Sequence, residues 1–212
     1  CTKLITDVAR EKFGLAAPQL SELVAWADKI DTASFASAEE AIDRSEPVMR
    51  LTTVLEQHGD DKLLAQLVPM LRERPLAEVA SLPDIRRRYA PLGRKHDQFR
   101  ERMQQHSELI GRVVLTDLSD APLEVVGKFV GYALYPDTTY SVVLARLRTS
   151  LKIAVGYNPW CGKPLDTDIS ALCARHGGGG HPVVGGISLP VSQLAVARQI
   201  ARELAIELDS PR

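Results

Sequence analysis

The sequence contains few cysteines and few aromatic residues, and neither sign of charge is in excess. Its three cysteines, Cys1, Cys161 and Cys173, lie far apart and form no CxxC pair, which argues against a disulfide framework and a cysteine zinc site. With 26 basic and 27 acidic residues the formal net charge is −1, so any anion site must be local. No apolar run reaches the roughly 18 residues that a membrane span needs. We therefore expect a protein of the reducing cytoplasm without a membrane partner.

Residues 1–82 also lack strand-like segments. Apolar residues recur there at helical spacing, as in Leu4, Val8 and Phe13. A helical block without a sheet of its own predicts the C-terminal part of a domain whose front portion would precede Cys1.

Residues 83–110 form a polar stretch with sparse apolar positions, a pattern typical of a solvated helix between domains. Its basic side chains could touch a nucleic-acid backbone, but neighbouring acidic residues dilute that basic excess. We expect a linker helix over this stretch.

Residues 111–212 change character, because short β-branched segments appear. We expect strands at 113–116, 140–144, 151–155 and 187–189. We expect helices at 122–134, after the Asp166-Thr167-Asp168 cap, and at 191–207. This order predicts a compact mixed α/β domain whose helices cover the sheet.

Four consecutive glycines, Gly177, Gly178, Gly179 and Gly180, stand before His181 and form the most unusual stretch of the chain. Each glycine costs roughly 0.5–1 kcal/mol relative to alanine inside a helix or strand. One glycine is enough to end a helix, which is the simpler interpretation. Four of them suggest a loop whose backbone N–H groups converge on an anion, and hence a phosphate or nucleotide cradle.

The segment HGGGGHPVVGG at 176–186 resembles the GGGGH signature of the DHH-associated domain, the C-terminal lobe of DHH family phosphoesterases. The segment DTASF at 31–35 is similar to the DTGxF motif of that family, with Ala33 where glycine is usual. Residues 1–5 resemble the helix after the DHH triplet. The resemblance implies an α/β chain: a helical remnant of an α/β catalytic domain at 1–82, a linker helix at 83–110, and a compact mixed-sheet substrate-binding domain at 111–212.

The resemblance also implies metal chemistry. Family members hold two divalent ions, usually manganese, with an early DxD, the DHH triplet and further aspartates, and Asp31 matches the last of these. Asp28, one turn earlier, is a rival for that role. No DHH or early DxD occurs here, and Asp60-Asp61 and the Asp166-Thr167-Asp168 segment fit helix caps better. One aspartate cannot hold a two-Mn²⁺ site, so we expect this chain alone to be inactive and to be a fragment of the enzyme.

In that frame Gly177, Gly178, Gly179, Gly180 and His181 would hold the phosphate or sugar of a short substrate. Two further residues are candidate substrate contacts, Lys152 on the strand at 151–155 and Asn158 after it. Asn158 fits equally well as the start of an Asn-Pro turn. Gly156 lies where nanoRNases, one branch of the family, carry an arginine. Trp160 either stacks a base or fills the core.

Three functions remain open from the sequence. The first is a divalent-metal-dependent phosphoesterase fragment that acts on phosphodiester or phosphomonoester bonds of short oligonucleotides or nucleotides. The second is a non-enzymatic nucleic-acid-binding module related to the C-terminal domain of alanyl-tRNA synthetases. The third is a regulatory interaction domain without a nucleotide ligand. The sequence leaves the oligomeric state open, a homodimer included.

Overall fold

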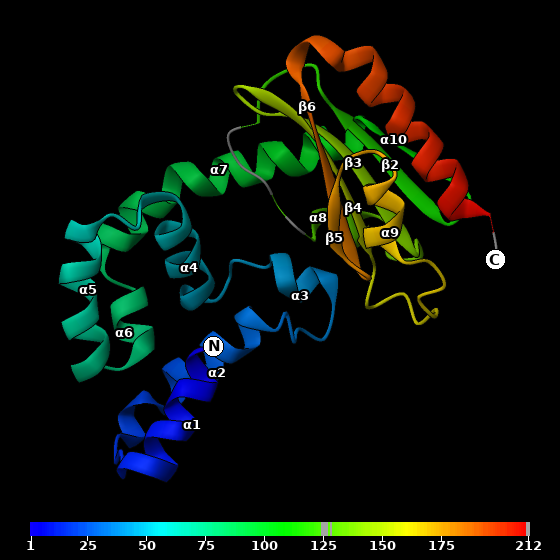
Figure 1. The fold of residues 1–212 in the computed structure, drawn as a ribbon. Helices are drawn as coiled ribbons and strands as arrows, with labels where there is room; N and C mark the ends of the chain where they lie inside the picture. The colour runs from blue at the N-terminus through cyan, green and yellow to red at the C-terminus, as the bar shows by residue number, and fades with distance from the viewer. Residues whose placement is uncertain (124–126, 128, 211–212) are drawn as a thin grey trace. The chain divides into compact units, whose positions relative to one another are not determined.

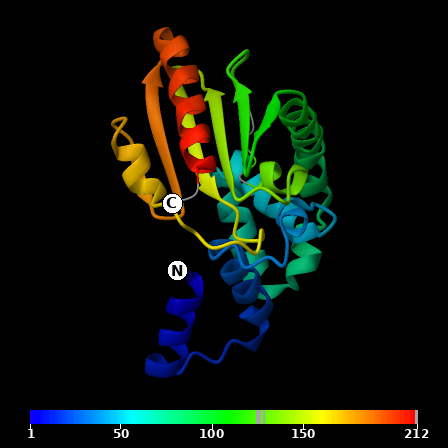
Figure 2. The same ribbon diagram turned by 90° about the vertical axis from the view of Figure 1, so that its right-hand side faces the viewer.

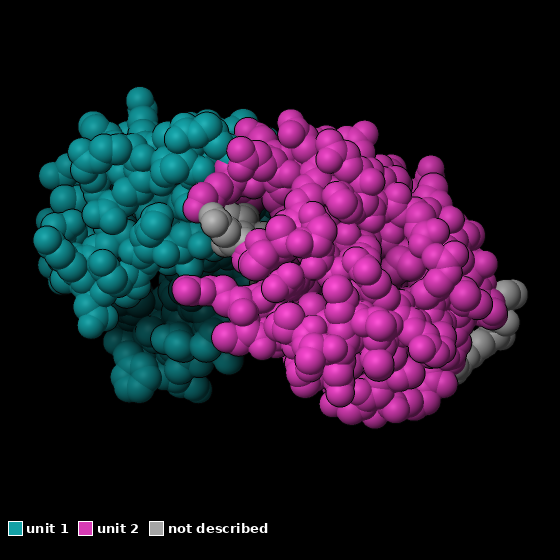
Figure 3. Space-filling model, turned by 90° about the horizontal axis from the view of Figure 1, so that it is seen from above, with its two compact units in different colours: residues 1–94 teal, residues 95–212 magenta. Residues whose placement is uncertain are grey.

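The computed structural model describes residues 1–123, 127 and 129–210, and the chain runs from a helical first half to a sheet with helices on it (Figure 1 and Figure 2). It divides into two compact units, residues 1–94 and 95–212 (Figure 3). The division falls inside the stretch that was predicted as a linker. In the described part of the chain, no helix is long and apolar enough to cross a membrane.

The first unit is helical throughout, as expected. Its elements are α1 (Thr2–Phe13), η1 (Pro18–Leu20), α2 (Ser21–Asp31), α3 (Ala38–Ile42), α4 (Pro47–His58), α5 (Asp61–Glu73), α6 (Leu76–Ala80) and the beginning of α7 (Pro83–Gln105). Fully buried residues such as Val54, Leu63 and Val79 form its core. Asp60 accepts a hydrogen bond from the Leu63 N–H at 2.8 Å, so the predicted cap role of this aspartate is confirmed.

Helix α7 ends earlier than the predicted linker helix. Residues 107–110 instead form β1, which turns at Gly111 and pairs antiparallel with the next strand. The sequence was misleading because β1 is only four residues long and its first two, Ser107 and Glu108, continue the polar pattern of α7. The difference matters, since β1 supplies one edge of the sheet.

The second unit is built on one six-stranded sheet. Its strands are β1 (Ser107–Ile110), β2 (Val113–Leu118), β3 (Tyr140–Arg146), β4 (Ser150–Tyr157), β5 (Gly179–His181) and β6 (Val184–Pro190). Their order is β1-β2-β3-β4-β6-β5, and only the β2–β3 pair is parallel. The four predicted strands are confirmed, and the mixed sheet confirms the α/β class.

Two helices, α9 (Ile169–Ala174) and α10 (Leu194–Asp209), cover one face of this sheet (Figure 1). The core lies between these helices and the sheet, because alternate strand residues such as Tyr140, Leu151 and Ile153 point into it. The opposite face meets α8 (Val130–Leu134), where the Ser141 hydroxyl donates to the Tyr132 hydroxyl. The helix predicted at 122–134 is therefore shorter in the described residues, and positions 124–126 and 128 lie outside them.

Candidate functional site

The first two glycines of the run complete the end of α9. This helix begins at Asp168, whose carboxylate accepts from the Ala171 N–H at 3.1 Å. At its other end the Gly177 N–H donates to the Ala174 carbonyl, and the Gly178 N–H donates to the Cys173 carbonyl. These bonds satisfy carbonyl groups that every helix end leaves free. The amides of Gly177 and Gly178 are thus already bonded.

The next two glycines belong to a strand. Gly179 and Gly180 lie in β5, in register with Gly186 and Gly185 of β6, and Pro182-Val183 forms the turn. In an antiparallel ladder, alternate residues direct their N–H and C=O groups toward the partner and away from it. The four glycines therefore do not form the single loop of converging amides that the sequence suggested. They form a helix end followed by an edge strand.

The structure also shows which glycines the fold itself requires. A Cβ on Gly178 would lie 2.7 Å from Ile187 Cγ1 and would strike the Gly186 carbonyl. Gly180 has φ of +153°, and a Cβ there would lie 2.6 Å from the Gly185 Cα. Gly179 has neither a positive φ nor any atom within 4 Å of such a Cβ. Folding thus accounts for the absence of a side chain at Gly178 and Gly180, and it does not at Gly179.

Gly179 lies on a bare part of the sheet surface. Residues opposite each other on paired strands share a face, and the register aligns Gly179 with Gly186 and then with Ala154. The next aligned row on this face contains Gly156. We call Ala154, Gly179 and Gly186 the glycine floor, and Gly156 adjoins it. It lies on the face opposite α9 and α10, because Ile153 and Val155 of the same strand point into the core beneath those helices.

Two polar side chains flank the glycine floor. Lys152 is exposed on β4, and its Cε lies 3.4 Å from where a Cβ on Gly186 would be. His181 is exposed on β5, and it aligns with Val184 and then with Gly156. Lys152 and His181 are therefore on one face with little side-chain bulk between them. Such a surface can receive a flat or extended ligand against the main chain, with a cation at one end and an imidazole at the other.

The β3 side of the floor is bounded by aromatic residues. A Cβ on Gly156 would strike the Tyr132 hydroxyl, so this hydroxyl occupies the space beside the position where nanoRNases carry an arginine. Burial raises the pKa of Tyr132 to about 12, and the phenol is therefore neutral at ordinary pH. Trp160 packs edge-on against Phe129, with ring centroids 5.3 Å apart. This packing is what we expect if Trp160 fills the core and does not stack on a base.

Asn158 is 1% exposed, and its side chain is fully used within the fold. Its amide group donates to the carbonyls of Pro136 and Thr138, at 3.1 and 2.8 Å. Its oxygen accepts from the Trp160 N–H at 3.1 Å. These contacts are the ones expected if Asn158 starts an Asn-Pro turn. Both N–H donors of its side chain are used, so none is left for a phosphate.

Asp31 lies in the other unit, at the exposed end of α2. Its carboxylate pairs with the amino group of Cys1 at 3.1 Å. Two residues later Ala33 has φ of +52°, a backbone conformation that glycine adopts far more readily. This geometry explains why the resembling motif has glycine there, and it supports the alignment of 31–35 with DTGxF.

A two-metal site needs several carboxylate or imidazole ligands around each ion. Among residues 1–123, 127 and 129–210, no group of three His, Cys, Asp or Glu side chains is placed to hold a metal ion. Asp31 belongs to no such group of three. The residues present therefore do not fit a two-manganese centre, and no catalytic step can be derived from this chain alone.

Sequence reasoning missed the glycine floor as a surface. It singled out the consecutive glycines, but Ala154 and Gly186 join Gly179 only through the pairing of β4, β6 and β5. The alternation of large apolar residues with small or polar ones along 151–156 was the available signal. It identifies the face of β4 on which Lys152 lies.

No family model matches the sequence, and no curated protein matches it. Among solved structures, the pGpG-specific phosphodiesterase PggH from Vibrio cholerae is 22% identical, over 96% of this chain and 73% of that one, with a TM-score of 0.74. A DHH domain from a member of the s1p family of ribosomal proteins is 12% identical, over 77% and 42% of the two chains, with a TM-score of 0.44. The C-Ala domain of Aquifex aeolicus alanyl-tRNA synthetase is 13% identical, over 47% and 97%, with a TM-score of 0.33.

The chain thus has the α/β fold of a phosphodiesterase along nearly its whole length. At 22% identity this likeness shows the fold alone, and the resemblance of the sequence motifs to those of DHH phosphoesterases agrees with it. The solved structure is longer than this chain, which spans 73% of it.

Proposed function

We propose that this chain is the substrate-binding part of a phosphoesterase that hydrolyses short oligonucleotides or nucleotide phosphodiesters. The observation that carries the proposal is the bare glycine floor between Lys152 and His181, on a fold shared with a pGpG-specific phosphodiesterase. Gly179 is the most informative residue, because the fold gives no reason for its missing side chain.

The chemistry of the floor suits a sugar-phosphate chain. A ribose or phosphate can approach the main chain closely where Gly179 and Gly186 have no side chains. The Lys152 ammonium would attract a phosphate, and the His181 imidazole would hydrogen-bond to a phosphate or hydroxyl oxygen. Both groups are exposed to solvent, so each contact contributes modestly and we expect weak binding by this chain alone.

Hydrolysis requires more than this chain contains. We propose that two Mn²⁺ ions act in the full-length enzyme, with Asp31 as one ligand and the others from residues outside this sequence. The proposal for Asp31 is supported by the DTASF resemblance and by the left-handed Ala33. This chain mixed with Mn²⁺ and pGpG should therefore show no hydrolysis by chromatography. Release of mononucleotides at an enzymatic rate would contradict the inactive fragment.

Binding can be tested by titrating pGpG into the ¹⁵N-labelled chain and following amide shifts. We expect shifts at residues 179–186 and at Lys152. Gly179→Ala should weaken binding at least about fivefold while the melting temperature stays unchanged, because its Cβ would enter the ligand's space and touch no protein atom. His181→Ala should weaken binding in the same way by removing a hydrogen bond.

His58→Ala is the matched control, since His58 is an exposed histidine of the other unit. It should leave pGpG binding unaffected. Normal affinity in Gly179→Ala, or no shift at residues 179–186 at millimolar pGpG, would reject the proposed site. If the chain binds a structured RNA more tightly than pGpG, the result would favour the non-enzymatic nucleic-acid-binding module. If it binds neither, only the regulatory interaction domain without a nucleotide ligand would remain of the three functions.

A further inference from the structure

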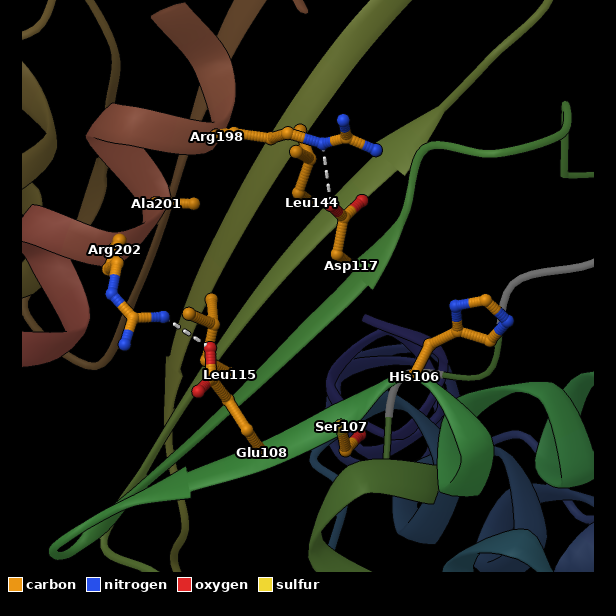
Figure 4. Close-up of a pocket in the computed structure, with 9 residues that line it drawn as sticks. All are labelled: His106, Ser107, Glu108, Leu115, Asp117, Leu144, Arg198, Ala201 and Arg202. Carbon is orange, nitrogen blue, oxygen red and sulfur yellow. Dashed lines mark hydrogen bonds and ion pairs between the residues drawn. The ribbon is translucent and has the colours of Figure 1, made fainter. Parts of the chain in front are cut away.

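A pocket lies on the face of the sheet opposite the glycine floor, where α10 crosses the β1–β2 edge (Figure 4). Its volume of about 350 Å³ is within the range of small-molecule sites. Leu115 of β2, Leu144 of β3 and Ala201 of α10 give it an apolar floor. Because Leu115 and Leu144 point toward α10, this pocket is separate from the glycine floor.

Two arginines one helical turn apart form the helical wall of this pocket. Figure 4 shows Arg198 and Arg202 reaching from α10 toward the strands. Arg198 Nε donates to Asp117 at 2.8 Å, and Arg202 donates to Glu108 at 2.6 Å. His106, at the end of α7, lines the far side.

Both guanidinium groups keep donors for a ligand. A guanidinium has five N–H donors. Within the described part of the chain, Arg202 makes one hydrogen bond, and Arg198 makes two, to Asp117 and to the Ser119 hydroxyl. The Arg198 and Arg202 side chains are 52% and 57% exposed, so their remaining N–H groups are within reach of a solute.

We propose that this pocket binds a small organic anion whose oxyanion group accepts hydrogen bonds from Arg198 and Arg202 and whose apolar part covers Leu115 and Leu144. Arginine suits this role because its planar N–H groups match the geometry of carboxylate and phosphate oxygens. The strand carboxylates keep the two guanidinium groups near the pocket through weak, exposed ion pairs. A purely apolar ligand would accept no hydrogen bonds from the arginines, and a cation would be repelled by two guanidinium groups.

The existing ion pairs do not block such a ligand. Exposed ion pairs contribute little to stability, so an arginine can shift toward a new oxyanion at small cost. Burial opposes ionisation of Asp117, but hydrogen bonds from Ser119 and from Arg198 outweigh it and lower the pKa of this carboxyl. Asp117 therefore stays ionised at neutral pH and keeps Arg198 over the pocket.

The test uses phenylphosphonate, which has an oxyanion head and an apolar ring, with inorganic phosphate as the probe that lacks the ring. Both are titrated into the ¹⁵N-labelled chain. We expect phenylphosphonate to shift amides of residues 107–109, 115–117 and 198–202 and to bind somewhat more tightly than phosphate. Its ring would pack against the pocket floor, although Leu115 and Leu144 are only 7% and 1% exposed. Arg202→Gln should weaken phenylphosphonate binding about tenfold, since a charged hydrogen-bond donor is lost.

Arg175→Gln is the matched control. Arg175, at the end of α9, is 51% exposed and pairs with Glu207 of α10 at 2.6 Å, but it lies outside the pocket. It should leave phenylphosphonate binding unchanged. An equal loss in Arg175→Gln would reveal a general charge effect and would overturn the proposal.

Two other results would also overturn it. One is the absence of shifts at residues 198–202 at about 10 mM phenylphosphonate, where a millimolar site would be largely filled. The other is a response confined to residues 179–186, which would assign the anion to the glycine floor. The pGpG titration is read at residues 179–186 and at Lys152, none of which lines this pocket, so either proposal can fail alone.

Discussion

The two units differ in whether glycine occurs where the backbone conformation requires it. After α2 the backbone takes the left-handed conformation at Ala33, where glycine would be the favourable residue. Between α9 and β6 the chain places four glycines in a row, although the fold forbids a Cβ by close approach only at Gly178 and Gly180.

The difference separates structure from function. At Ala33 the neighbouring contacts maintain a costly conformation: Ser34 N–H donates to the Lys29 carbonyl, and the buried Phe35 anchors the turn. At Gly179 neither a close contact nor a positive φ requires glycine, which is why we propose a ligand there. A glycine-rich motif is therefore evidence for binding only after the glycines required by packing have been set aside.

The largest expected effect is on stability, and it distinguishes Gly178 from its neighbour Gly179. Gly178→Ala should destabilise residues 95–212 by about 2–3 kcal/mol, because the new Cβ meets the backbone of β6 and Ile187, which cannot easily move. Gly179→Ala should change stability by less than about 0.5 kcal/mol. Urea unfolding in a Trp26→Phe background, where Trp160 is the remaining tryptophan, measures both. Equal losses would show that all four glycines are structural and would remove the contrast with Ala33.

A second prediction compares the electrostatics of the two units. In the second unit Asp166 accepts from Arg112 at 2.5 Å and from the Tyr140 hydroxyl at 2.6 Å. The Arg112 hydrogen bond lowers the pKa of Asp166 from its ordinary 3.8 to about 2, while burial opposes that change. Ion pairs of the first unit, such as Lys3–Asp7, are exposed.

The sign of the pH dependence follows from this lowered pKa. The ionised Asp166 stabilises the fold above about pH 4, and this stabilisation is lost as the pH falls toward 2. Asp166→Asn should cost about 1–2 kcal/mol at pH 7, and this cost should shrink as the pH falls through about 2. Asp137→Asn, at an exposed position, should cost little at either pH. A pH-independent loss in Asp166→Asn would show that its charge is unimportant.

The smallest effect belongs to the first unit. Ala33→Gly should stabilise residues 1–94 by about 0.5–1 kcal/mol, because the left-handed penalty of alanine exceeds the entropy that glycine loses. Urea unfolding followed by Trp26 fluorescence in a Trp160→Phe background measures the change. Ala36→Gly, in the same loop but without a positive φ, should be neutral or destabilising. A gain of equal size in both variants would mean that loop entropy, and not the left-handed turn, is responsible.

Much of the secondary structure could be predicted from local patterns. The strands at 140–144 and 151–155 and the helix at 191–207 follow from β-branched runs and helical spacing, and the structure has β3, β4 and α10 there. The strand β5 was missed because glycine has little intrinsic preference for strands, and only pairing with β6 holds it extended. Asn158 was ambiguous because its partners at Pro136 and Thr138 are some twenty residues away.

The amino-acid order by itself determined the helical first half, the mixed α/β second half and the position of the glycine run, because these depend on periodicity and composition within short windows. Only the tertiary structure decided which glycines the fold requires and which lie bare. The reason is physical: a side chain is forbidden at Gly178 by atoms of β6, and Gly179 joins Gly186 and Ala154 only through strand pairing. Contacts between residues distant along the chain exist only after folding.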